Sequence, residues 1–116
     1  MTNLYLRPQD RQRLEDLLAR HLPNVSAWAY GSRVNGDAHD SSDLDLALRS
    51  PDLRPIPWRE LDTFLQAVCD SNIPILIDAH DWARLPAAFQ QEILRNHVVL
   101  RQGNSPDSNG AVDPAP

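Results

Sequence analysis

Two aspartates separated by one residue, Asp43 and Asp45, are the side chains in this sequence best suited to chemistry. They belong to the segment DLDLALR, in which Asp43, Asp45 and Ala47 alternate with leucines, as expected for a β-strand with one apolar face. On a strand both carboxylates project from the same face and repel each other, and a hard divalent cation that binds both removes the repulsion. The pair therefore predicts a Mg²⁺ site.

A Gly31-Ser32 turn follows a short apolar segment upstream of these aspartates. A glycine here lets the backbone approach an anion closely, and free N–H groups and the serine hydroxyl can hold phosphate oxygens. Arg33, the next residue, either contacts a phosphate or pairs with Asp37 or Asp40. Because Mg²⁺ prefers a few carboxylates together with substrate phosphates and water, the turn and the aspartate pair together predict a nucleotide site.

A third carboxylate, Asp78, lies near the end of the apolar run IPILIDA. With two bound ions, one would activate an attacking hydroxyl and the other would neutralise charge on a leaving pyrophosphate, and Asp78 is placed to act on the nucleophile. Asp81 competes for this role, but it stands just before Trp82, where a capping aspartate is common. We therefore assign the role to Asp78, and we interpret His39 and His80 as surface residues.

Alternating helices and strands are expected to position these residues. Periodic apolar residues predict helices over residues 9–22, 58–71 and 86–97. Short apolar runs predict strands over residues 25–30, 43–49, 73–79 and 98–101, with residues 31–42 as a loop. This order predicts an α+β (α/β) fold, in which helices pack on one face of a small β-sheet.

Length and composition limit the possible functions. The 116 residues are enough for one core, which we expect within residues 1–101, and residues 102–116 are predicted to form a disordered tail. No apolar run is long enough to span a membrane, and charges near the start of the chain argue against an export signal. Because 16 acidic residues outnumber 11 basic residues, direct binding of nucleic acid is not expected.

The single cysteine, Cys69, excludes a disulfide framework and any multi-cysteine metal site. It is consistent with a reducing compartment, and the cytoplasm is the expected location. Because Cys69 lies on the apolar side of its predicted helix, we expect its side chain to be buried.

The run GSRVNGDAHDSSDLDL, residues 31–46, resembles the signature of the polymerase-beta-like nucleotidyltransferase superfamily, in which Gly-Ser is followed by Asp-x-Asp. Within that superfamily the run and the short chain are most similar to the minimal nucleotidyltransferases, the antitoxin partners of HEPN-domain toxins. The run IDAHDW, residues 77–82, resembles the strand of the third carboxylate, with Asp78 at the metal position. The resemblance covers residues 10–101 and implies a mixed β-sheet with helices on one face.

The resemblance also implies roles for these residues. Gly31 and Ser32 would hold the triphosphate of ATP, Asp43 and Asp45 would bind Mg²⁺, and Asp78 would be the third ligand and the base. Members of the family transfer AMP from ATP to a tyrosine near the active site of a HEPN ribonuclease, which silences it, and they also bind the ribonuclease in a complex.

Three other functions remain open from the sequence. The first is an antitoxin that acts by binding alone, with an idle nucleotide site. The second is a nucleotidyltransferase that acts on a small molecule or an RNA. The third is a sensor that binds nucleotide or metal without turnover. Longer relatives add a second domain that holds small acceptors, so the length of this chain favours a protein acceptor.

Overall fold

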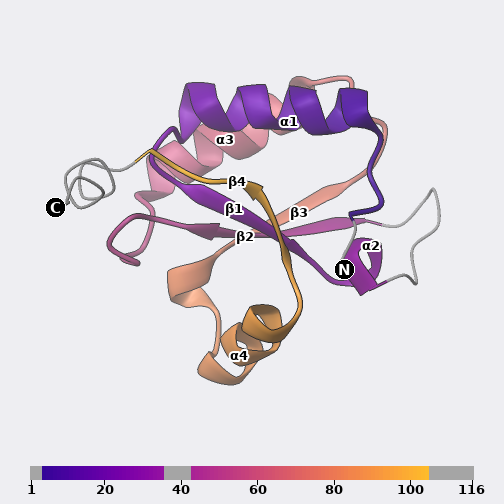
Figure 1. Ribbon diagram of the computed structural model, residues 1–116. Coiled ribbons are helices and arrows are strands. Elements are labelled where there is room, and N and C mark those ends of the chain that lie inside the picture. Colours follow the sequence, from indigo (N-terminus) through magenta and orange to yellow (C-terminus); the bar gives the residue numbers. More distant parts are fainter. Residues whose placement is uncertain (1–3, 36–42, 105–116) are drawn as a thin grey trace, which may run out of the picture.

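The computed structural model describes residues 4–35 and 43–104. Four strands form one sheet with the order β3-β2-β1-β4 (Figure 1). Their bounds are Ser26–Tyr30 for β1, Leu44–Arg49 for β2, Ile77–Asp81 for β3 and Val98–Arg101 for β4. Strand β1 pairs antiparallel with β2 and β4, whereas β2 and β3 are parallel. The sheet is therefore mixed, in agreement with the expected α+β fold.

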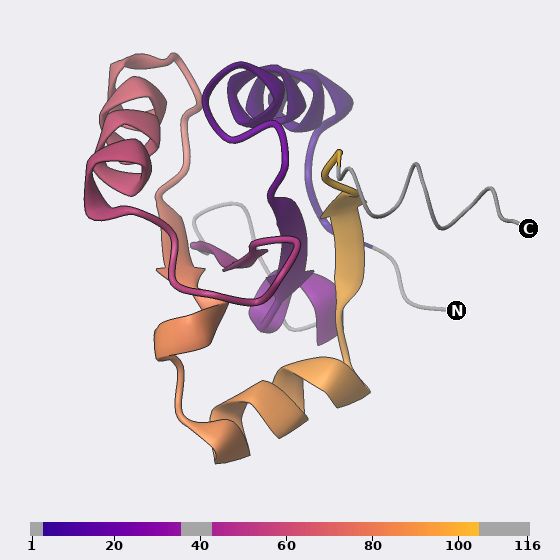
Figure 2. The same cartoon turned by 90° about the vertical axis from the view of Figure 1, so that its left-hand side faces the viewer.

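Two long helices, α1 (Pro8–His21) and α3 (Trp58–Asp70), lie side by side over one face of the sheet (Figures 1 and 2). Helix α3 provides the crossover connection that the parallel β2–β3 pair requires. Alternate residues of β1 and β2 point toward these helices and are fully buried, and they join leucines of α1 and Phe64 of α3 in the main core. This core fixes the β2 register, because a shift by one residue would turn its leucines to the opposite face.

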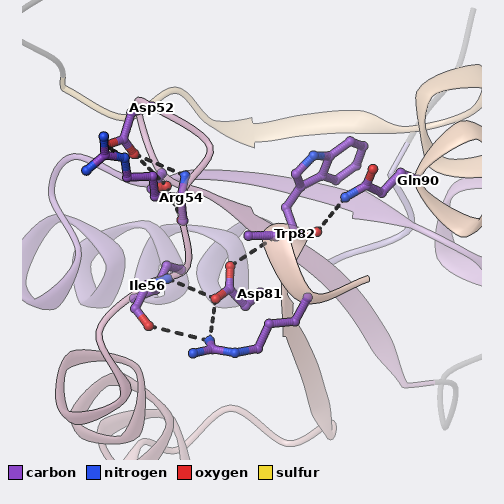
Figure 3. Close-up of polar contacts among 9 residues, drawn as sticks. Asp52, Arg54, Ile56, Asp81, Trp82 and Gln90 are labelled. Carbon is purple, nitrogen blue, oxygen red and sulfur yellow. Dashed lines mark hydrogen bonds and ion pairs between the residues drawn. The ribbon is translucent and has the colours of Figure 1, made fainter. Parts of the chain in front are cut away.

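The opposite face of the sheet is covered by the 3₁₀-helix η1 (Trp82–Arg84) and by α4 (Ala87–Arg95), as Figure 2 shows. Here Trp82 and Ile93 pack against Ala47 of β2 and Tyr30 of β1 in a second, smaller cluster. Helix α4 is tied to η1 by a hydrogen bond from Nε2 of Gln90 to the Trp82 carbonyl, 2.7 Å long (Figure 3). The remaining helix, α2 (Ser32–Asn35), is one short turn that directly follows β1.

Three expectations from the sequence are wrong in detail. Helices were expected on one face of the sheet, but η1 and α4 cover the other face as well, because Trp82 and Ile93 bury its apolar residues. The third strand starts at Ile77 and ends at Asp81, whereas residues 73–79 were expected, because Pro74 lacks the N–H that a strand ladder uses. The side chain of Cys69 is exposed, although burial was expected. Cys69 follows Val68, the last residue of the buried stripe of α3, and is turned from it by about 100° around the helix.

The other predicted elements agree with the structure within a few residues at each end, and the terminal strand agrees at both ends. Residues 102–104 carry no helix or strand, and the rest of the predicted tail lies outside the described residues. Across residues 4–35 and 43–104, no helix combines the length and the apolar character needed to cross a bilayer.

Candidate active site

The side chains of Tyr30, Asp45 and Asp78 form a row across three adjacent strands. Tyr30 is the register partner of Asp45 on β1, and Asp78 is the partner of Asp45 on β3. Partners in neighbouring strands project from the same face, so the two carboxylates stand next to each other with the phenol beside them. Asp43 is exposed and lies two residues before Asp45. The structure therefore brings Asp45 and Asp78 together, as the sequence-based hypothesis requires.

The surroundings of Asp45 disfavour its charged form. Burial raises the pKa of the Asp45 carboxyl, the nearby charges of Asp78 and Asp43 raise it further, and His80 partly offsets them. Burial also raises the pKa of the Tyr30 hydroxyl to about 12, with contributions from Asp45 and Asp78. Tyr30 is therefore protonated at neutral pH, and its hydroxyl is available as a hydrogen-bond donor in this carboxylate row.

Replacing Asp45 with Asn is expected to stabilise the metal-free protein. Because the folded state raises the pKa of Asp45, ionisation destabilises the fold as pH rises from the ordinary value of 3.8 through the raised pKa. Asn removes this penalty, so the melting temperature at pH 7 should increase by roughly 2–4 °C. Thermal unfolding in the presence of EDTA, followed from pH 8 toward pH 3.5, should show the gain shrinking at the acid end. A gain that does not change with pH would contradict this explanation.

Gly31 ends β1 and brings the backbone close to Asp45. Its φ of +83° lies in the left-handed region, which side chains other than glycine rarely adopt. A Cβ atom at this position would lie 2.4 Å from Oδ2 of Asp45. The glycine is therefore required both by the backbone conformation of the turn and by the position of the carboxylate.

A Gly31→Ala variant should lose about 1–3 kcal/mol of unfolding free energy, because of the positive φ and the collision with Asp45. Urea unfolding of the single variant and of Gly31→Ala combined with Asp45→Ala separates the two causes. The second substitution removes the carboxylate that the new methyl group meets, so part of the loss should be recovered. If the double variant recovers nothing, the close approach to Asp45 contributes nothing to the cost.

Ser32 and Arg33 follow this glycine in α2. Ser32 is half-buried, and the turn is closed by the Val34 N–H, which donates to the Gly31 carbonyl over 3.0 Å. Arg33 is only 4% exposed, and its Nη1 donates to the Tyr5 carbonyl over 2.7 Å. Its guanidinium thus contacts the N-terminal segment, and its contact with a phosphate stays a prediction. The alternative partners at positions 37 and 40, and the histidine at position 39, lie outside the described residues.

The two candidates for the third carboxylate have different surroundings. Asp78 is half exposed and contacts Nε2 of His80 over 3.2 Å. Asp81 is 5% exposed, and its carboxylate accepts hydrogen bonds from the backbone N–H groups of Ile56 and Ala83 and contacts Arg84 (Figure 3). Asp81 caps η1, as its position before a tryptophan suggested, although it is the last residue of β3 and not beyond it. Only Asp78 is accessible to a substrate.

Two neighbours of the carboxylates, Tyr30 and His80, were not identified as site residues from the sequence. His80 stands two residues after Asp78 on β3 and shares its face, so the alternation of strand residues is a signal that was available. Tyr30 enters the row only through its pairing with Asp45, which depends on the register of two strands.

The chemistry of these donors fits Mg²⁺ bound together with a nucleotide. Mg²⁺ takes one or two carboxylates and completes its octahedron with substrate phosphates and water. Asp45 and Asp78 supply two adjacent carboxylates whose mutual repulsion a cation would relieve. Within residues 4–35 and 43–104 no group of three or more His, Cys, Asp or Glu side chains is gathered closely enough to hold an ion by itself. The two carboxylates are thus suited to an ion that completes its coordination with the phosphates of a substrate.

Comparisons with known proteins agree with this geometry. The family described as "Polymerase beta, Nucleotidyltransferase" matches residues 12–105. A curated protein of Haemophilus influenzae, named "Probable protein adenylyltransferase MntA", is 34% identical over 89 residues, which cover 77% of this chain and 76% of that protein.

Two solved structures share the fold. One is described as the crystal structure of a toxin-antitoxin with AMP-PNP, with a TM-score of 0.65 and 18% identity over 89% of this chain and 82% of that chain. The other is a mutant of the toxin-antitoxin MntA-HpeT, with a TM-score of 0.64, 16% identity and the same coverage. At this level of identity the likeness concerns the fold alone.

Proposed function

Because this chain belongs to the polymerase beta nucleotidyltransferase family, we propose that it is a protein adenylyltransferase that acts as the antitoxin of a toxin partner. It transfers AMP from ATP to a hydroxyl of that partner, and this modification neutralises the toxin. The curated relative named as a protein adenylyltransferase and the structural likeness to a chain of a toxin-antitoxin crystallised with AMP-PNP support this choice. We further propose a HEPN-domain ribonuclease as the toxin and a tyrosine as the acceptor, by the family resemblance of residues 31–46.

The observation that carries the proposal is the pairing of Asp45 with Asp78 in register on adjacent strands, beside the Gly31 turn. We propose that the turn holds phosphate oxygens, and its close approach to Asp45 supports binding of the triphosphate of ATP next to the carboxylates. Asp78 is exposed and so accessible to a hydroxyl of another protein.

The reaction forms one bond and breaks one bond. The acceptor oxygen attacks the α-phosphorus, the bond from that phosphorus to the oxygen bridging to the β-phosphate breaks, and pyrophosphate leaves. Asp78 accepts the proton of the attacking hydroxyl, and Tyr30 is placed to donate a hydrogen bond within the carboxylate row. Asp43, Asp45 and Asp78 would hold Mg²⁺, which would neutralise the charge of the phosphates. We expect two ions.

The direct test is co-expression of the chain with the product of its neighbouring reading frame, followed by intact-mass measurement of that partner. A gain of whole AMP units on the partner is the expected result, and peptide mapping identifies the acceptor residue. A stable complex in which the partner keeps its unmodified mass would instead indicate an antitoxin that acts by occlusion.

The cytoplasmic location expected from the single cysteine stays a prediction, which fractionation of the native host would test.

A further inference from the structure

Arg33 and the N-terminal segment, residues 4–7, are joined by three contacts. The Tyr5 N–H donates to the Arg33 carbonyl over 2.7 Å, and Nη1 of Arg33 donates to the Tyr5 carbonyl over the same distance. The Arg33 guanidinium also lies over the Tyr5 ring, 5.4 Å from its centroid. Backbone and side chain of Arg33 are thus both bound to one residue that lies far from it in sequence.

The N-terminal segment is itself anchored on both sides of Tyr5. Leu4 and Leu6 pack against the main core, and Arg7 makes two hydrogen bonds to the buried carboxylate of Asp10 at the start of α1. A cavity of about 490 Å³ lies between this segment and residues 74–75, so few atoms fill the space around the segment. The polar contacts of Tyr5 are therefore one of the ways in which this segment holds α2.

Helix α2 has only four residues and follows the Gly31-Ser32 turn directly. A single helical turn is not stable by itself, because nucleation of a helix is unfavourable. The position of α2, and of the turn in front of it, therefore depends on contacts from outside the helix. Val34 anchors α2 in the main core, and the contacts of Arg33 with Tyr5 join the helix to a second segment that is distant in sequence.

We propose that Arg33 is a positioning residue: by binding Tyr5 it holds the Gly31-Ser32 turn against Asp45 and thereby sets the affinity of the protein for the triphosphate of ATP. This inference rests on the proposed function for the nucleotide, but the hold of Tyr5 on the turn does not depend on it. If Arg33 acts by binding Tyr5, a substitution of Tyr5 changes the affinity for ATP. If Arg33 contacts the phosphate directly, a substitution of Tyr5 leaves that affinity unchanged.

Calorimetric binding of ATP in the presence of Mg²⁺ distinguishes the two roles. Arg33→Met removes the guanidinium, and Tyr5→Pro removes the N–H donor and the ring without changing Arg33. Each variant should raise Kd about tenfold, the equivalent of one hydrogen bond. Each variant keeps one hydrogen bond that the other removes, and both lose the contact of the guanidinium with the ring, so the double variant should raise Kd by less than the product of the two effects. Arg13→Met, on an exposed position of α1, is the matched control and should bind as the unaltered protein does.

The proposal is overturned if Tyr5→Pro binds ATP normally while Arg33→Met does not, since Arg33 would then act on the nucleotide directly. It is also overturned if the two losses multiply in the double variant, or if neither variant affects binding. Hydrogen exchange of the amides of residues 31–35 without nucleotide should be faster in both variants, and unchanged exchange would overturn the proposal by itself. If the unaltered protein binds no ATP, the proposed function fails, and the exchange measurement still decides whether Tyr5 holds the turn.

Discussion

The double variant Asp43→Asn, Asp45→Asn is expected to transfer AMP to its toxin partner at least about a thousandfold more slowly, while it still binds that partner. Asn keeps the shape of Asp but removes the negative charge of Asp45 in the carboxylate row beside Gly31 and that of Asp43, two residues before it. Without these charges the site cannot attract the cations that screen a triphosphate. Intact mass of the partner after co-expression, with toxicity scored in the same cells, measures both transfer and neutralisation.

The matched control for this experiment is Asp62→Asn, Asp70→Asn, which removes two carboxylates from exposed positions of α3 and changes the net charge equally. It should transfer AMP at the normal rate. If the Asp43, Asp45 variant leaves the partner unmodified and yet still neutralises it, catalysis is not needed, and the protein acts by covering its partner. If that variant still modifies the partner, the carboxylate pair is not the metal site.

The part of the site within one strand was predictable from the sequence. Alternation along DLDLALR places the carboxylate of Asp45 on one face and the leucines on the other, and the structure buries those leucines against α1 and α3. The parts that depend on pairing between strands were not predictable in the same way. Strand β3 runs parallel to β2 with Asp78 opposite Asp45, and Tyr30 joins the same row from β1. Both features depend on the register between strands, which the sequence of one strand alone does not encode.

The environment of Arg33 shows a second limit of sequence analysis. The sequence suggested a phosphate or a nearby aspartate as its partner, and these stay predictions. The structure adds a contact with Tyr5, which is distant in sequence and which no local pattern indicates. Cys69 shows a third limit, since periodicity indicates which side of a helix is apolar but not how far burial extends around it. Helix α3 covers a sheet of only four strands, and only a narrow stripe of it is buried.

Replacing Asp81 with Ala is expected to cost about 2–4 kcal/mol of unfolding free energy. The Asp81 carboxylate is buried and accepts the backbone N–H of Ile56 over 2.9 Å and that of Ala83 over 3.2 Å, and it also pairs with Arg84 (Figure 3). These contacts join the loop before α3 to the end of β3. Ala leaves the Ile56 N–H without its acceptor and removes the cap of η1. Urea unfolding with an unchanged m-value would measure the loss.

Asp78→Ala, three residues earlier on the same strand, is the matched substitution and should have the opposite effects. Its side chain is half exposed and, among the ion pairs of the described residues, contacts only His80, so removing it should change stability by about 0.5 kcal/mol or less. Transfer of AMP should nevertheless be lost, because no carboxylate then stands beside Asp45 to receive the proton of the acceptor hydroxyl. The two variants thus separate a carboxylate that builds the fold from one that performs the reaction. If Asp81→Ala is stable and inactive while Asp78→Ala is active, the third carboxylate of the site is Asp81, and the burial of that side chain must then be relieved when the nucleotide binds.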